Sequence, residues 1–124
     1  MRENLPVTQK EVRMREGSRL ITTTDPRGVI TYCNDDFEEI SGFSREELVG
    51  SPHNIIRHPD MPPAVYADMW NYLKAGKAWM GIVKNRTKTG DHYWVSAYVT
   101  PVKENGELIG YESVRVAPEE IQKD

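Results

Sequence analysis

"AWMGIVKNRTKTGDHYWVSAYVTPVKENGELIGYESVRV" (residues 78–116) is the stretch that decides the fold predicted for this sequence. It contains three segments rich in β-branched and aromatic residues, which favour strands. Residues 89–91 (Thr-Gly-Asp) and 104–106 (Glu-Asn-Gly) separate these segments, and Asn-Gly is a strong signal for a tight β-hairpin. The final third of the chain is therefore predicted to form three consecutive antiparallel strands.

A second pair of strands is predicted near the start of the chain. Residues 19–33 hold two β-branched runs on either side of residues 25–28 (Asp-Pro-Arg-Gly), a sequence typical of a type I turn. Asn34 follows at the position of a helix N-cap, with acidic residues in the next turn. A capping box at residues 44–47 (Ser-Arg-Glu-Glu) predicts another short helix that ends near Gly50.

The middle of the chain is predicted to be helical but irregular. Residues 51–62 hold too many prolines and polar residues for regular structure throughout, whereas residues 63–75 predict a longer helix that Gly76 ends. The order of two strands, three helices and three strands predicts an α+β fold. In it, short helices cover one face of a five-stranded antiparallel sheet and leave a cavity between the layers. The apolar stripe of the longer helix is Val65, Tyr66, Met69, Trp70 and Leu73.

The composition is that of a soluble globular domain. The chain has 124 residues, a formal net charge of −3 and 38% apolar residues, which suits one hydrophobic core. Nucleic-acid binding is not expected, because it needs clustered excess Lys and Arg. The single Cys33 excludes an internal disulfide, and no apolar run predicts membrane insertion or a signal peptide. We therefore expect a cytoplasmic domain, which could be the soluble end of a longer membrane receptor.

Three parts are expected along the chain. Residues 1–18 are polar and are interpreted as an N-terminal cap, mobile or dependent on a partner, with a helix over 8–16 as the weaker alternative. Residues 19–118 form the predicted domain. Residues 119–124 are expected to begin a C-terminal linker.

One short segment concentrates polar side chains. HNIIRHPDMP (residues 53–62) holds two of the three histidines, an arginine and an aspartate, beside two prolines that restrict the backbone. If this segment is helical, His53 and Arg57 leave the same face, four residues apart. His58 and Asp60 could then fix the segment itself. This concentration favours one wall of a ligand pocket over a solvated loop with a local ion pair.

Several motifs resemble those of PAS domains. SGFSREELVG (41–50) and GIVKNRTKTGDHYWV (81–95), with Asn34 opening the first helix, are similar to the general PAS pattern. PHNIIRHPDMPPAVYADMW (52–70), followed by KAWMGIVKNRTKTGDHYWV (77–95), resembles more specifically the sensor domain of bacterial aerotaxis receptors. The similarity covers roughly residues 18–118.

This resemblance implies a function and a set of partners. It implies non-covalently bound FAD, and redox or oxygen sensing that steers swimming through a membrane-anchored signalling region. The implied partners are the HAMP-like or methyl-accepting part of a larger receptor and a second copy of the chain in the full receptor. A flavin-binding energy sensor, and not an enzyme, is therefore the expected function.

A flavin ring needs aromatic or apolar faces, hydrogen bonds along its pyrimidine edge and a controlled charge nearby. Trp79 or Trp70 could stack on the ring, although either could be a core residue. Asn85, in a strand where Asn is unfavourable, could bond the ring edge or face solvent. Arg57 would offer planar donors to a carbonyl edge or a phosphate, and Asn34 is first a helix cap. The expected cofactor-binding residues are His53, Arg57, His58, Asp60, Trp70, Trp79, Asn85 and Asn34.

Other functions remain open at this point. A haem-binding gas sensor on the same fold would use His53 or His58 as an axial ligand. A ligand-free PAS module for dimerisation or interaction would have a filled core. A flavoenzyme is the weakest alternative, because the sequence shows no nucleophile–base constellation and no Gly-rich phosphate loop. Cys33, at a strand end, is interpreted as a small buried hydrophobe and not as a light-reactive thiol, and no metal site is expected.

Overall fold

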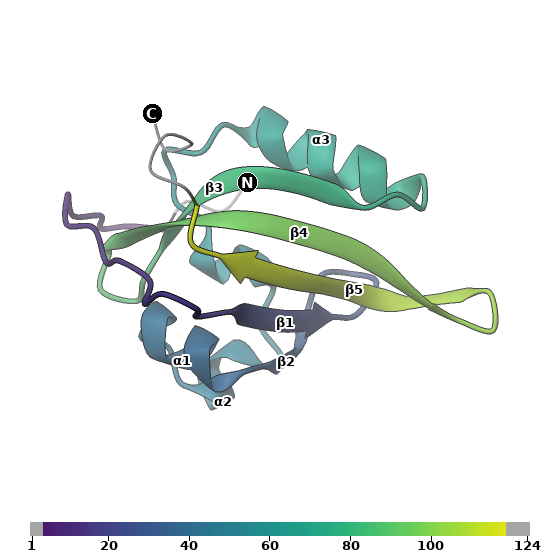
Figure 1. Cartoon of the computed structure of the whole chain (residues 1–124), viewed down its shortest axis with the longest axis horizontal. Coiled ribbons are helices and arrows are strands. Elements are labelled where there is room, and N and C mark those ends of the chain that lie inside the picture. Colours follow the sequence, from purple (N-terminus) through teal and green to yellow (C-terminus); the bar gives the residue numbers. More distant parts are fainter. Residues whose placement is uncertain (1–3, 119–124) are drawn as a thin grey trace.

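Five strands form a single antiparallel sheet, and the last strand lies at its centre (Figure 1). The computed structural model describes residues 4–118. Across the sheet the strand order is β2-β1-β5-β4-β3, which confirms the predicted α+β PAS-type architecture. The strands are β1 (Leu20–Thr24), β2 (Ile30–Cys33), β3 (Trp79–Arg86), β4 (His92–Glu104) and β5 (Glu107–Val116).

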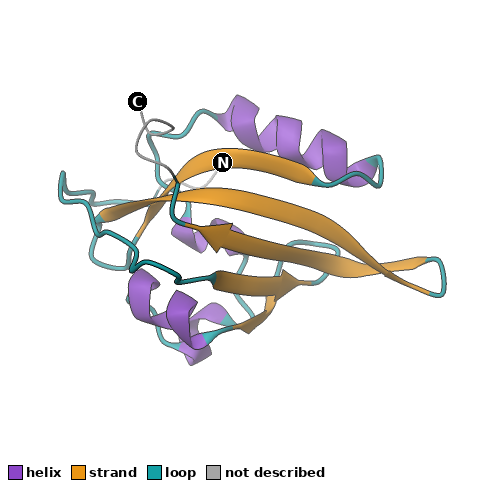
Figure 2. Ribbon diagram, viewed as in Figure 1, coloured by secondary structure: helices purple, strands orange, loops and turns teal. Residues whose placement is uncertain are grey.

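The helices lie between the second and third strands in sequence, and Figure 2 shows how short most of them are. α1 contacts β1, α2 contacts β2, and α3 contacts β3 and β4. The predicted helix over 63–75 is confirmed as α3, which begins at the proline pair and ends one residue early. The helices are α1 (Asp35–Ser41), α2 (Arg45–Leu48), the 3-10 helix η1 (His53–Ile56) and α3 (Pro63–Lys74).

The two predicted helix caps are present, and one of them also joins helix to sheet. Asn34 Oδ1 accepts from Phe37 N at 3.2 Å, as an N-cap does. The same oxygen accepts from Ile21 N of β1 at 3.1 Å, and Asn34 Nδ2 donates to Arg19 O at 2.8 Å. The capping box of α2 makes no bond to the sheet, because it pairs only residues 44 and 47.

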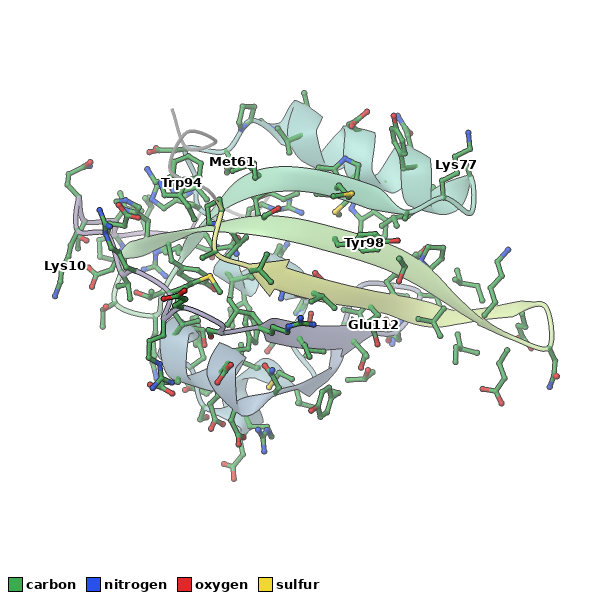
Figure 3. All side chains as sticks on the ribbon, viewed as in Figure 1. Lys10, Met61, Lys77, Trp94, Tyr98 and Glu112 are labelled. Carbon is green, nitrogen blue, oxygen red and sulfur yellow. The ribbon has the colours of Figure 1, made fainter. Side chains whose placement is uncertain are left out.

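The hydrophobic core lies between the sheet and the helices. Leu20, Phe37, Leu48 and Tyr93 are fully buried there. Cys33 is buried with them, as predicted for a small hydrophobe. The other face of the sheet is open along its centre, where Figure 3 shows Tyr98 on β4 and Glu112 on β5.

The N-terminal segment crosses the far end of the β3–β4 hairpin without forming a helix. Thr8 N donates to Gly90 O at 2.9 Å, and His92 N donates to Lys10 O at 3.0 Å. Residues 8–16 are therefore not helical, and the helical alternative was wrong. The Asn4 side chain is buried and reaches the η1 segment. The expected dependence on a partner stays a prediction, and the linker expected at 119–124 lies outside the described residues.

The role of Asn34 can be separated from that of an ordinary helix cap. Replacing Asn34 by Ala removes bonds to α1, to β1 and to Arg19, so we expect a loss of about 2–3 kcal/mol in the free energy of unfolding. Replacing Ser44 by Ala removes only the local cap of α2 and is expected to cost about 1 kcal/mol. Urea denaturation of both variants measures the difference. Equal losses would show that Asn34 acts as a helix cap alone.

Candidate functional site

A cavity of about 290 Å³ lies between the inner face of the sheet and the segment that runs from η1 into α3. Its volume is close to the lower end of the range of about 300–1,000 Å³ that is typical of small-molecule pockets. Strands β1, β3, β4 and β5 supply one wall, and η1, α3 and the β1–β2 turn supply the other. The lining residues are Thr22, Thr24, Arg27, Gly28, Pro52, His53, Asn54, Ile56, Arg57, Tyr66, Met69, Trp70, Leu73, Trp79, Val83, Asn85, Ala97, Val99, Tyr111, Ser113 and Arg115.

Both predicted tryptophans line this cavity. Trp79 is buried, and its Nε1 donates to Asp68 Oδ2 of α3 at 3.1 Å. Its indole occupies the space that a side chain at Gly81 would take, because a Cβ there would lie 2.4 Å from Trp79 Cη2. The Trp70 ring meets the Tyr111 ring edge-on, with centroids 5.2 Å apart. Each tryptophan therefore packs in the core and also presents part of its surface to the cavity.

Asn85 faces inward, so the solvent-facing alternative is wrong. It is 4% exposed and lies among the cavity lining. Its backbone forms an isolated antiparallel bridge with Arg57, which ties β3 to the end of η1. Within residues 4–118 its Nδ2 makes no hydrogen bond of good geometry, and the Tyr93 hydroxyl is its polar neighbour. A buried amide donor without a partner is costly, and it marks a place where a ligand acceptor would fit.

His53 lies in a buried polar cluster at the inner face of the sheet. Its Nε2 is 3.1 Å from Thr22 Oγ1 and is contacted by Arg115 Nη2. Arg115 Nη2 also donates to Thr22 Oγ1 at 2.9 Å. Burial and the neighbouring Arg115 charge hold the pKa of His53 well below its ordinary value of 6.5, so the imidazole is neutral at pH 7.

Arg57 lines the cavity from the opposite wall. Its guanidinium Cζ lies 3.7 Å from the centroid of the Tyr66 ring, a cation–π distance. Burial lowers the pKa of Arg57, but the group stays charged. The Asn4 amide holds this wall by donating to Asn54 O at 3.0 Å and to Arg57 O at 2.8 Å. His53 and Arg57 thus both reach the cavity, although η1 ends at Ile56 and Arg57 is extended.

Three of the predicted cofactor-binding residues do not line the cavity. His58 is buried behind the wall, where its Nδ1 accepts from Asp60 N at 3.1 Å. Asp60 is exposed and pairs with Lys84 at 2.9 Å. Asn34 is occupied by its bonds to α1 and β1. His58 and Asp60 therefore brace the wall, and direct contact of these three residues with a cofactor stays a prediction.

Arg115 is the functional candidate that the sequence analysis missed. In β5 the residues Tyr111, Ser113 and Arg115 point inward, whereas Val116 faces outward. The hydropathy of alternate residues predicts that the valines of this strand face the core and that the arginine faces solvent. The pattern therefore assigned Arg115 to the wrong face of the sheet. The only signal was the unusual pairing of Ser and Arg at alternate positions of a central strand.

Residues 4–118 contain no group of three or more His, Cys, Asp or Glu side chains placed to hold a metal ion. None of their helices has both the length and the apolar character needed to cross a bilayer.

Comparison with known proteins assigns the family. The sequence pattern described as "PAS fold" matches residues 30–115. The chain belongs to the PAS fold family. This PAS domain is also similar in structure to a PAS domain from Colwellia psychrerythraea, with a TM-score of 0.73 and 22% identity over 86% of this chain and 88% of that one. The blue-light photoreceptor Aureochrome1 LOV, in its dark structure, matches with a TM-score of 0.73 and 20% identity over 83% of this chain and 76% of that one.

Curated relatives of this PAS domain are parts of signalling proteins. The aerotaxis receptor of Escherichia coli is 50% identical over 109 residues, which is 88% of this chain and 22% of the receptor. A nitrogen fixation regulatory protein of Klebsiella pneumoniae is 31% identical over 99 residues, which is 79% of this chain and 20% of that protein. The chain thus spans about a fifth of the length of these two relatives. The predicted resemblance to the sensor domain of aerotaxis receptors is confirmed.

A pair of buried histidines behind the cavity wall makes stability dependent on pH. The rings of His58 and His92 meet edge-on with centroids 6.0 Å apart. His58 Nε2 and His92 Nδ1 find no hydrogen-bond partner in the described part of the chain. Burial, and next the charge of Lys84, lower the pKa of both imidazoles below 6.5. The folded protein therefore holds fewer protons on them than the unfolded chain does.

We expect the free energy of unfolding to fall as the pH drops below about 6.5, because the unfolded chain then binds more protons. The carboxylates with lowered pKa, Asp25, Glu47 and Asp60, lose their contribution only below their ordinary values of 3.8 to 4.5. Replacing His58 by Gln should reduce the slope between pH 6.5 and roughly pH 5, whereas His53 and His92, whose pKa values are also lowered, keep the rest of the slope. Urea denaturation across this range is the measurement, and an unchanged slope in His58→Gln would contradict the assignment.

Proposed function

We propose that this PAS domain binds FAD and acts as the redox-sensing part of an aerotaxis-type receptor. Two findings support the proposal: the 50% identity to the aerotaxis receptor of Escherichia coli and a cavity with aromatic and polar walls. The observation that carries it is the buried Asn85 amide without a partner in the described chain. A heteroaromatic ring with acceptor atoms along one edge would satisfy that amide.

The lining residues fit a flavin ring. Trp79 and Trp70 would supply aromatic contact, and Asn85 would bond the polar edge of the ring. Arg57, stacked on Tyr66, would offer fixed donors to a carbonyl or a phosphate. The volume suits a fused ring and not a whole dinucleotide, so the rest of FAD would extend beyond the cavity. Bound flavin would supply reversible electron transfer.

A signal could leave the cavity through Asn85. Its side chain lies at the proposed ring edge, while its backbone bridges Arg57 on the opposite wall. A change in what the amide bonds would shift the balance between two packings of β3 and the η1 segment. We further propose that the partner reading this change is the signalling region of a longer receptor. Such a receptor would be a homodimer with this domain in the cytoplasm.

The cavity lining fits a haem-binding sensor or a ligand-free module less well than a flavin-binding domain. An axial haem ligand needs a free histidine nitrogen, but His53 Nε2 is engaged by Thr22 and Arg115. His58 is absent from the cavity lining. A ligand-free module would not need buried polar groups around a cavity. We expect no catalytic activity, in line with the signalling relatives.

The visible absorption spectrum of the purified chain, before and after dithionite, tests the cofactor. We expect flavin bands that bleach on reduction, and FAD as the molecule released by heat. A haem-type Soret band would favour the gas-sensor alternative. A colourless protein that still fails to take up added FAD would refute the proposal.

Arg57→Ala tests the wall that holds the ring. Loss of a hydrogen bond to a charged donor costs about 1.5–3 kcal/mol, so flavin binding should weaken roughly tenfold to a hundredfold. The far-UV circular dichroism of the sheet should not change. Arg45→Ala is the matched control, because Arg45 pairs with Asp35 on the surface away from the cavity. Full flavin retention in Arg57→Ala would count against this role.

A further inference from the structure

The cavity contains a buried positive charge that the described chain does not neutralise. Arg115 is 3% exposed and lies among the cavity lining. The ion pairs of residues 4–118 involve other cations, and no carboxylate in that range pairs with this guanidinium. An isolated buried charge is among the most costly features of a protein interior. Its presence in a cavity wall therefore points to a ligand that carries the opposite charge.

The partners that Arg115 does have are neutral. Its Nη2 donates to Thr22 Oγ1 and contacts His53 Nε2, and its Nη1 lies 3.5 Å from Leu20 O. The Phe37 ring centroid is 5.1 Å from its Cζ. These contacts hold the guanidinium in place, but they supply no negative charge.

The titratable groups around Arg115 do not change this balance. Burial lowers the pKa of Arg115 to about 10, which still leaves it cationic at pH 7. Burial raises the pKa of the nearby Tyr93 phenol, so Tyr93 is neutral. His53 is also neutral, and because its Nε2 accepts from Arg115, its proton belongs on Nδ1. Arg115, Tyr93 and His53 together therefore carry one net positive charge.

Arg57 differs from Arg115 in its surroundings. It lies in the other wall, only half-buried, and its charge is already placed against the Tyr66 ring. Solvent screens a partly exposed charge more strongly than a buried one. Arg115 should therefore have a larger effect on the charge state of a ligand than Arg57.

We propose that Arg115, held by Thr22 and His53, makes the cavity bind the negatively charged form of its ring ligand more tightly than the neutral form. The proposal rests on flavin as that ligand. Oxidised flavin has a neutral ring. Two electrons from a reductant such as dithionite, together with one proton from water, convert it to a ring with one negative charge. Arg115 would thus favour the reduced cofactor and raise its midpoint potential.

The test compares Arg115→Gln with Arg115→Lys in the flavin-loaded protein. Dithionite titration against a reference dye gives the midpoint potential, and the potential reports the ratio of affinities for the two redox forms. For Arg115→Gln we expect this ratio to fall at least tenfold, which equals about 30 mV for a two-electron couple. Arg115→Lys keeps the charge and should stay within about threefold of the wild type, or roughly 15 mV. Arg57→Ala should weaken the binding of both redox forms, with a smaller change in the ratio of the two affinities.

The outcomes separate this proposal from the proposed function. If the wild-type chain binds no flavin, the proposed function fails. If the wild type binds flavin and Arg115→Gln has an unchanged potential, the role of Arg115 is refuted while flavin binding stands. If Arg115→Gln loses both redox forms to the same extent, as measured with added FAD, Arg115 supports only the shape of the cavity and the proposal is also refuted.

Discussion

Polar side chains on the inner face of the sheet need hydrogen-bond partners, and this need determines how closely the helices can pack on the sheet. Thr22 and Ser113 are cross-strand neighbours on β1 and β5, and Arg115 pairs in register with Leu20 on one side and Ala97 on the other. Asn85 adds an amide from β3. A helix packed directly on these groups would bury them without enough partners, which costs more than the packing gains. The helical layer instead leaves a cavity over them.

The helices stay in place above the cavity because hydrogen bonds at the ends of the helical layer fix them to the sheet and to the N-terminal segment. α1 has seven residues and α2 has four, lengths that are not stable alone. Asn34 fixes the start of α1 to β1, and the Trp79–Asp68 bond joins the start of β3 to α3. The Asn4 amide holds the backbone of η1 from outside. These polar ties replace apolar packing where the cavity interrupts the core.

The relatives illustrate how one fold serves several receptors and regulators. The Aureochrome1 LOV structure shares this architecture at 20% identity, so the likeness extends to the backbone and not to particular side chains. The cavity lining of this chain therefore has to be interpreted from its own residues. Two arginines without an ion pair in residues 4–118 (Arg57 and Arg115), the Asn85 amide without a partner in that range, and two tryptophans line one cavity. These side chains give the domain its chemical character.

The sequence alone determined the element order, the hairpin turns, both helix caps and the apolar stripe of α3, because these depend on residues close together in the chain. It also located five of the eight expected site residues in the cavity: His53, Arg57, Trp70, Trp79 and Asn85. Only the tertiary structure decided that Arg115 faces inward, since β5 takes its register from β1 and β4. The partners of Arg115 lie 62 and 93 residues away, and local alternation of hydropathy carries no information about contacts at that separation. The position of His58 behind the wall was decided in the same way, by its contact with His92, and the exposed position of Asp60 by its ion pair with Lys84.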